Sequence, residues 1–360
     1  MGFSVKVLAD SLAPCGQRLT TMEWTYPRPI HSEIMTHRDL SKNSASSRAI
    51  PPEKLIERIL ADPWVPEYIG VNQKGMAPGE ELTGEARTAA VDAWLGARDI
   101  AIAHARELIR LKVHKGVVNR LLEPWMWITI IISGTEWPNL FALRLDKMAE
   151  PHFQHVARMA KAAMDASTPR KLVAGEWHTP LVASEDIPLV TDYVAAKVGQ
   201  FGLTEIGITG EIPKDVEKLA QETLVKVSVG RCARISYLTH EGKRDIKEDV
   251  RLHDDLIVKR PLHASPAEHA AQAMDWPGWW KTDRWRWPVI DGVTVNELRK
   301  LHDKWDSSEL LRYEYHKELT ILSRLLDDMH SGNFWGFKQY RKTLAHENIT
   351  SWADVPMVQS

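Results

Sequence analysis

The segment from Thr36 to Arg48 concentrates side chains that could bind an anion. It holds His37, two arginines (Arg38 and Arg48) and four serines. Forked guanidinium groups donate paired hydrogen bonds to phosphate oxygens, and serine hydroxyls and loop N–H groups can complete such a site. The segment therefore indicates a nucleotide-binding loop, and an exposed polar loop is the alternative.

A second set of arginines follows farther along the chain. Arg120 comes four positions after Gly116, and Arg144 ends the segment Asn139–Arg144. Taken alone, this pattern indicates a helix that carries arginines on its solvent-exposed face.

The third cluster begins with Arg234 and Ser236 and continues in the run His263-Ala264-Ser265-Pro266-Ala267-Glu268-His269. Serine, proline and glutamate at this spacing predict the start of a helix. A zinc site is excluded, because no cysteine lies near the histidines and no HExxH pattern exists. The free N–H groups of such a helix start also suit phosphate groups.

Together the three clusters resemble the signature motifs of flavin-dependent thymidylate synthases. That family has Arg-His-Arg followed at fixed spacing by Ser, Asn, Ser and Arg, and the positions in register here are His37, Arg38, Ser41, Asn43, Ser46 and Arg48. It also has an arginine after a glycine at a helix end and an Asn-x-x-x-Leu-Arg helix, to which the second cluster is similar. Its Ala-Arg-x-Ser segment and its His-x-Ser/Thr-Pro-x-Glu-His run match the third cluster at every fixed position.

The resemblance implies a fold and a reaction. We expect an α/β (α+β) domain with long helices around a mixed sheet, spanning residues 1–360 as one domain with a possible insertion at 276–335. The implied reaction transfers a one-carbon unit from methylene-tetrahydrofolate to C5 of a deoxypyrimidine monophosphate, dUMP to dTMP in the group's common case, with FAD as cofactor and NADPH as co-substrate. Hydroxymethylation of dUMP or dCMP by the same fold is the alternative.

The resemblance also assigns roles to individual residues. The catalytic candidates are Arg144, which would face the pyrimidine ring, and Ser46, which would hydrogen bond near it. The substrate-binding candidates are Arg48, Arg120, Ser46 and Glu33. The cofactor-binding candidates are His37, Arg38, Asn43, Ser236, His263, Ser265 and Glu268, and no metal ligand is expected.

The chain departs from the family pattern in composition and in order. Thr36, Ser44 and Ala49 replace an arginine, an acidic residue and an aromatic residue. These changes leave open whether the base is uracil or cytosine and whether the product is methyl or hydroxymethyl. The run 263–269 follows the Thr36–Arg48 segment, whereas it precedes that segment in ordinary members, and Asn333–Lys342 could supply the aromatic strand and turn that usually lie between them. We therefore expect a divergent, permuted or rearranged relative.

C5 of a pyrimidine is a weak nucleophile, so electron density must be pushed toward it. The only cysteines are Cys15 and Cys232, and neither lies in a motif, which argues against a covalent cysteine adduct. Polarisation of the ring by arginine is the alternative. Reduced FAD would then deliver a hydride and give a methyl product, whereas addition of water would give a hydroxymethyl product.

Sequence patterns also predict the elements that must position these residues. Alternation predicts strands at Val5–Ala9, Arg18–Tyr26 and Leu224–Leu238, and the apolar run Trp125–Ser133 suits a buried element. Helices are expected at Ile30–Arg38, Glu53–Leu60, Glu85–Lys115, Asn139–Ala166 and Lys247–Lys259, with one or two more within Val295–Asp328. Pro151 should kink or divide the helix that contains it.

Composition narrows the class of protein. The chain is 44% hydrophobic and 26% charged, with a net charge of −2, as in a soluble globular protein without a bulk charge for nucleic acids or membranes. No signal peptide or membrane span is recognisable, so we expect a cytoplasmic protein with no membrane or nucleic-acid partner. The family resemblance adds a homotetramer whose active sites collect residues from several subunits.

Two alternatives stay open at this point. The tryptophans of Trp276–Trp287 alternate with basic residues, and we expect them to pack in a loop, although such a pattern could also stack bases. A Trp-rich protein that binds nucleotides or nucleic acid without catalysis is the non-enzymatic alternative. Flavin absorption bands would count against it.

Overall fold

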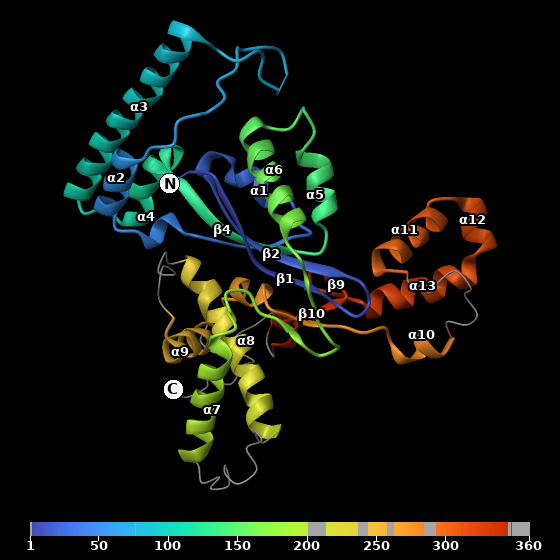
Figure 1. Cartoon of the computed structure of the whole chain (residues 1–360). Coiled ribbons are helices and arrows are strands. Elements are labelled where there is room, and N and C mark those ends of the chain that lie inside the picture. The colour runs from blue at the N-terminus through green and yellow to red at the C-terminus, as the bar shows by residue number, and fades with distance from the viewer. Residues whose placement is uncertain are drawn as a thin grey trace.

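Helices surround a mixed sheet in the computed structural model, which describes residues 2–75, 77–200, 214–236, 244–257, 263–283, 293–344 and 347. Over these residues the strands form one five-stranded, one three-stranded and one two-stranded sheet. Figure 1 shows helices on both sides of the long amino-terminal strands. The predicted α/β (α+β) class is confirmed.

The five-stranded sheet has the order β3-β4-β2-β1-β5. Its strands are β1 (Ser4–Leu12), β2 (Arg18–Pro27), β3 (Ser41–Ser44), β4 (Trp127–Gly134) and β5 (Arg170–Lys171). Neighbours pair antiparallel except β1 and β5, which are parallel. The two amino-terminal strands and the buried apolar run were predicted correctly. β3 was not, because it lies in the polar segment that indicated a loop.

The two faces of this sheet pack against different helices. Alternate residues such as Met22, Trp24 and Tyr26 of β2 point to one face, since successive side chains of a strand alternate. On that face they pack against α1 (His31–Met35), α5 (Trp137–Arg144) and α6 (Pro151–Ala166). On the other face Ile131 packs against Cys232 and Ile235. Both faces are therefore covered.

The prediction of a strand at Leu224–Leu238 is wrong, because residues 214–236 form the helix α8 (Lys214–Ser236). Its side chains enter three separate apolar clusters: Val227 packs in one, Val229 in another and Ile235 in a third. Every residue from Val227 to Ile235 is buried, so this part of the helix has no polar face and its period of 3.6 residues is hidden. The valines at alternate positions then imitate a strand.

Ion pairs fix α8 between α7 (Asp186–Gln200) and α9 (Ile246–Ile257). Arg231 donates to Asp186 at 2.6 Å and to Asp249 at 2.9 Å, and Arg234 donates to Asp249 at 2.7 Å. These side chains are almost fully buried, and each charge has a partner, as burial requires.

The other predicted helices are present with changed limits. Pro151 divides the segment Asn139–Ala166 into α5 and α6, and as the first residue of α6 it needs no N–H donor. The long amphipathic helix is α3 (Gly84–Arg110), and Gly116 lies in the separate short helix α4 (Lys115–Val118). The remaining helices are α2 (Pro52–Ala61), α10 (Gly278–Asp283), α11 (Val295–Asp306), α12 (Glu309–Glu314) and α13 (His316–Asp328), so Val295–Asp328 holds three helices.

Short strands complete the fold: β6 (Trp177–His178), β7 (Ala271–Ala273), β8 (His330–Ser331), β9 (Phe334–Trp335) and β10 (Phe337–Gln339). The three-stranded sheet has the order β10-β7-β6, and β8 pairs with β9. The strand and turn expected in Asn333–Lys342 are present, because β10 leads directly into a 3-10 turn at Tyr340–Thr343.

The tryptophans in the described part of the Trp-rich stretch are packed, as predicted. Trp280 is buried with Leu298 and Leu322 in a core that also includes Cys15 of the β1–β2 hairpin. The indole N–H of Trp279 donates to Asp328 at 2.9 Å. Trp285 and Trp287 lie outside the described residues. Residues from the expected insertion 276–335 thus share a core with the amino-terminal hairpin.

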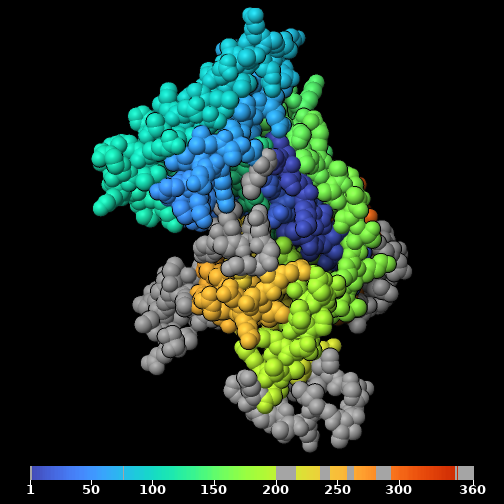
Figure 2. Space-filling model, turned by 60° about the vertical axis from the view of Figure 1, so that its left-hand side comes forward, coloured from blue at the N-terminus to red at the C-terminus, as the bar shows by residue number. Residues whose placement is uncertain are grey.

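Figure 2 shows how the parts are placed on one face of the molecule. The region of α2 and α3 forms one end, α7 and α9 form the other, and the amino-terminal strands lie between them. Within the described residues, none of the helices has both the length and the apolar character needed to cross a membrane.

Candidate functional site

A large cleft opens where β3 and the turn after it meet α4 and the carboxyl-terminal half of the chain. Its volume is about 1060 Å³. We call it the cationic cleft, and its lining residues are Arg28, His31, Lys42, Asn43, Ser44, Ala45, Ser46, Ser47, Arg48, Ala49, His114, Lys115, Arg120, Glu123, His263 and Ser265. Six of the site residues predicted from sequence are among them: Asn43, Ser46, Arg48, Arg120, His263 and Ser265.

The cleft carries an excess of positive charge. Its lining has arginines and lysines from three separate segments, and Glu123 is the one carboxylate among the described lining residues. Glu123 accepts a hydrogen bond from Ser47 at 2.8 Å and pairs with Arg28 at 3.4 Å. Arg48 and Arg120 are exposed and make no ion pair with a described residue. Their guanidinium donors are therefore available to an anion.

Asn119 holds the turn that carries Ser46 and Arg48. Its buried side-chain amide donates to the Ser47 carbonyl at 2.7 Å and to the Ile50 carbonyl at 3.0 Å. These carbonyls belong to the 3-10 turn Ser47–Ala49 and its end. Arg120 directly follows Asn119. The same hydrogen bonds therefore hold the segment that carries Arg120 next to the turn that carries Arg48.

Gly116 brings Arg48 close to α4. A Cβ atom at Gly116 would lie 3.5 Å from Cδ of Arg48 and 3.1 Å from Nδ1 of His114. The stem of Arg48 thus passes over the helix backbone, and its guanidinium group reaches the cleft.

The opposite wall brings His263 and Ser265 to β3. The Ser265 hydroxyl donates to Asn43 at 3.1 Å, and the Asn43 amide donates to the Cys232 carbonyl on α8 at 2.8 Å. Segments that are far apart in the sequence therefore meet, as the resemblance required. The helix predicted to start at Ser265 is only a 3-10 turn, Ser265–Glu268, so no row of free helical N–H groups forms there.

Glu268 holds the carboxyl-terminal strand and does not line the cleft. Its carboxylate accepts from Arg341, and its carbonyl accepts from Gln339 at 3.1 Å. Gln339 also donates to the Ser41 hydroxyl of β3 at 3.0 Å. This network fixes β10, the 263–268 segment and β3 as one unit.

Arg144, His37 and Glu33 form a separate group outside the cationic cleft. Nε of Arg144 donates to Nε2 of His37 at 2.7 Å, and its guanidinium group lies 4.7 Å from the centre of the Phe153 ring. Burial and the neighbouring Arg144 charge lower the pKa of His37 to about 4, so the ring is neutral and accepts this bond. Burial and Glu150 raise the pKa of Glu33. Within one chain, Arg144 therefore does not face Ser46, and its role at the ring stays a prediction.

Lys42 connects the two groups. Its ammonium donates to the carbonyls of His37 and Leu40, and its side chain also lines the cleft. Burial lowers the pKa of Lys42 to about 8, against the opposing effect of Glu268 and Asp39. Arg38 is exposed and lies outside the cleft, and the side chain of Ser236 lies outside the described part.

A second, mostly apolar cavity adjoins the cleft. Its volume is about 270 Å³, and we call it the apolar cavity. Its lining residues are Arg28, Ala45, Ser46, Ser47, Ile50, Leu55, Arg58, Ile59, Ala61, Asp62, Trp125, Met126, Trp127, Ile128 and Thr129. It shares Arg28, Ala45, Ser46 and Ser47 with the cationic cleft, so the two spaces meet at the turn that Asn119 holds.

Both cysteines are buried, and neither lines the cleft or the adjoining cavity. Burial raises the pKa of Cys15 to about 11 and that of Cys232 to about 12. Both thiols are protonated at neutral pH, and a protonated thiol is a poor nucleophile. Cys232 lies in α8, not in the strand that the sequence suggested, but the prediction that neither cysteine is a nucleophile agrees with this burial.

Sequence reasoning missed several residues that line the cleft or hold it. They are Arg28, His31, Lys42, His114, Lys115, Asn119 and Glu123. Arg28 follows a strand, and Lys42 lies inside the recognised motif, so each could have been included as a further cation. His114, Lys115, Asn119 and Glu123 become neighbours of the motif only through the packing of α4 and the turn after it against the turn after β3.

Comparisons with known proteins give little beyond this geometry. No family model matches the chain, and no curated protein matches it. Solved structures that are similar include a UMP/dUMP methylase PolB from Streptomyces cacaoi bound with 5-Br UMP, at 13% identity and a TM-score of 0.38, covering 45% of this chain and 88% of that one. The same methylase bound with 5-Br dUMP gives 15% identity and a TM-score of 0.33, covering 41% and 66%. The function of the site must therefore be inferred from its own residues.

Proposed function

We propose that this protein is a flavin- and folate-dependent enzyme that transfers a one-carbon unit to C5 of a deoxypyrimidine monophosphate, with dUMP to dTMP as the reaction. One observation carries the proposal. Six residues of the recognised motifs, from three distant segments, line one cationic cleft. Neither a solvated loop nor a helix with surface arginines requires that convergence.

Arg48 and Arg120 are assigned to the nucleotide phosphate. Both are exposed, without an ion-pair partner among the described residues, and they lie on segments that Asn119 holds together. A phosphate dianion between two guanidinium groups gains charge-assisted, paired hydrogen bonds. Ser46 lies where the cleft meets the apolar cavity and is assigned to the sugar or base.

The opposite wall carries the N–H and O–H donors of Lys42, His263 and Ser265. Such donors suit the phosphates of a flavin nucleotide. Asn43 also lines the cleft and holds Ser265 in place. Glu268 would act behind this wall, because its side chain already binds Arg341. A bound reduced flavin would supply the hydride, and methylene-tetrahydrofolate the carbon. The chain itself would orient the nucleotide and stabilise negative charge on the ring through fixed cations.

The proposal is tested by nucleotide binding and by product mass. Arg48→Ala and Arg120→Ala should each weaken dUMP binding by about tenfold or more, the effect of one lost charge-assisted contact. Arg110→Ala, at the exposed end of α3, is the matched control and should leave the dissociation constant unchanged. Equal affinity in all three variants would contradict the assignment.

The reaction is tested with flavin-loaded protein, methylene-tetrahydrofolate, NADPH and either dUMP or dCMP. The mass of the nucleotide product separates a methyl from a hydroxymethyl product and uracil from cytosine. A protein that binds dUMP but takes up no flavin and forms no product would be the non-catalytic nucleotide-binding protein.

A further inference from the structure

Glu123 is an acidic side chain in a cleft whose other charged lining residues, among those described, are cations. A phosphate needs hydrogen-bond donors, because its own oxygens accept hydrogen bonds. An ionised carboxylate only accepts them. Glu123 is therefore matched to a different part of the ligand, a group that donates a hydrogen bond.

Arg120 and Glu123 lie on the same face of one short helix. Both belong to the 3-10 helix Asn119–Trp125, and both side chains line the cationic cleft. In a 3-10 helix, side chains three residues apart eclipse each other and are separated by a rise of about 6 Å. The Glu123 carboxylate therefore lies about one helical turn from the position that bears the phosphate-binding candidate Arg120.

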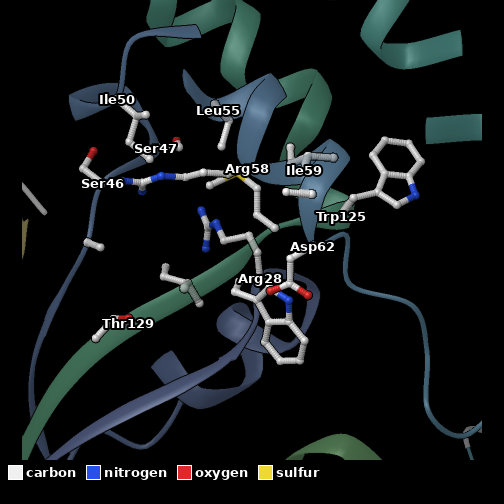
Figure 3. A pocket seen from close by; sticks show the side chains of 15 residues that line it. Arg28, Ser46, Ser47, Ile50, Leu55, Arg58, Ile59, Asp62, Trp125 and Thr129 are labelled. Atoms are coloured by element: carbon white, nitrogen blue, oxygen red, sulfur yellow. The ribbon is translucent and has the colours of Figure 1, made fainter. Parts of the chain in front are cut away.

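Ser47 and Arg28 hold the Glu123 side chain in place. The Ser47 hydroxyl donates to Oε1 of Glu123 at 2.8 Å, and Arg28 pairs with Oε2 at 3.4 Å. Figure 3 shows the guanidinium group of Arg28 on the side where Ser47 lies. Ser47 is next to Arg48 in the chain, so the carboxylate is held beside both arginines assigned to the phosphate.

The Glu123 carboxylate has acceptor positions left for a ligand. An ionised carboxylate offers about four lone-pair positions, and Ser47 and Arg28 are its described partners. The side chain is 25% exposed and lines the cleft. On a deoxynucleotide, the donor group closest to the phosphate is the 3′-hydroxyl of the sugar. That hydroxyl lies within one sugar of the phosphate, as the spacing of Arg120 and Glu123 requires.

We propose that Glu123 accepts a hydrogen bond from the 3′-hydroxyl of the nucleotide whose phosphate binds Arg48 and Arg120. Its negative charge then also excludes a nucleotide with a phosphate on that oxygen, as in a nucleic-acid chain. This inference rests on the proposed function and deepens it, because it adds a residue that determines which sugar is bound.

Calorimetric titration with two ligands tests the contact. dUMP and 2′,3′-dideoxyuridine 5′-monophosphate share the phosphate and the base, and only dUMP carries the 3′-hydroxyl. The unchanged protein should bind dUMP about tenfold tighter, the effect of one hydrogen bond to a charged group. Glu123→Ala should reduce this preference to roughly twofold or less, because the acceptor is lost.

Two further variants control for the charge and for the substitution itself. Glu123→Gln keeps a carbonyl acceptor and should retain part of the preference for dUMP. Glu57→Gln changes an exposed carboxylate of α2 that does not line the cleft, and it should leave the preference unchanged.

Deoxyuridine 3′,5′-bisphosphate gives an independent test of the charge. In a cleft lined by cations alone, its second phosphate should strengthen binding. Because Glu123 repels that phosphate, the unchanged protein should bind the bisphosphate more weakly than dUMP. Glu123→Gln removes the negative charge and should reverse this order.

A purely structural role for Glu123 gives a different pattern. If Glu123 only held Ser47 and Arg28, Glu123→Ala would change the affinities for dUMP and for the dideoxy analogue by the same factor. Each readout compares two affinities in one sample, so a partly unfolded variant does not imitate the predicted loss of preference.

The remaining outcomes separate this inference from the proposed function. If dUMP and the dideoxy analogue bind the unchanged protein equally, or if the bisphosphate binds more tightly than dUMP, this inference is wrong and the phosphate site stands. If neither dUMP nor the dideoxy analogue binds the unchanged protein, the proposed function itself is wrong.

Discussion

Asn119 shows how a residue that need not touch the ligand can determine the site. It is fully buried, and its amide holds the Ser47 and Ile50 carbonyls at 2.7 and 3.0 Å. Without it, the Ile50 carbonyl would lose this donor, and the Ser47 carbonyl would keep only the Ile50 N–H at 3.3 Å.

Replacement of this residue gives a prediction at the residue scale. Asn119→Ala should lower the free energy of unfolding by about 1–3 kcal/mol, because the Ile50 carbonyl loses its side-chain donor and the Ser47 carbonyl loses one of its two donors. It should also raise the dissociation constant for dUMP. Asn72→Ala is the control, because Asn72 lies in an exposed loop, and its unfolding free energy should change by no more than about 0.5 kcal/mol. Urea unfolding and calorimetric titration measure both effects, and a variant of unchanged stability would contradict the role.

At the scale of elements, α8 is the centre on which the cofactor wall depends. It packs against the sheet, α7, α9 and the 263–268 segment, and its Cys232 carbonyl accepts the Asn43 amide at 2.8 Å. The contact with α9 is closest at Gly230, where a Cβ atom would lie 2.2 Å from the Asp249 carbonyl oxygen. A side chain there would force the two helices apart.

Two alanine substitutions test this packing. Gly230→Ala should destabilise the protein by about 1–3 kcal/mol through overpacking. Gly96→Ala is the matched case on α3, because a Cβ atom at Gly96 meets nothing within 4 Å. It should stabilise the protein by up to about 1 kcal/mol through the higher helix propensity of alanine. Urea midpoints measure both changes, and equal effects would show that the close contact is not limiting.

At the scale of the whole molecule, a chain of buried histidines and hydroxyls joins the sheets. His178 binds Ser11 and Thr21 at 2.8 Å each, Thr21 binds Ser133 at 2.6 Å, and Ser133 binds His269 at 2.8 Å. Burial lowers the pKa of both His178 and His269 to about 3. Both rings are therefore neutral and hydrogen bonded in the folded protein.

This burial predicts a pH dependence of stability. The unfolded chain binds protons at the ordinary histidine pKa of about 6.5, and the folded chain does not, so stability should fall as pH drops below about 6.5. Each such histidine contributes a slope of up to about 1.4 kcal/mol per pH unit. His31 and His37, whose pKa values burial lowers to about 4, contribute in the same direction.

Urea unfolding at pH 7.5, 6 and 5 measures how the free energy of unfolding changes with pH. These pH values lie above the range where most carboxylates titrate. His178→Asn should reduce the number of protons taken up on unfolding by about one, and the slope of stability against pH falls in proportion. His104→Asn changes an exposed histidine on α3 and is the control. A slope that is equal in the two variants would contradict the buried-histidine account.

Local patterns in the sequence were sufficient for much of the fold. The alternation in β2, the two prolines that open α2 and α6, and the apolar run of β4 each depend on neighbours in the chain. Six of the residues that line the cleft were also predicted from sequence, because the motif spacing around Ser46 and Arg48 is a local property.

Tertiary packing decided the rest. Neighbouring elements bury every residue of α8 from Val227 to Ile235, so the local sequence does not record the helical period there. The separation of Arg144 from Ser46 and the existence of the apolar cavity depend on which faces of α2, α5 and β4 meet. Contacts between residues far apart in the chain decide such questions, because a cleft or cavity is a property of the assembled surfaces and not of any single segment.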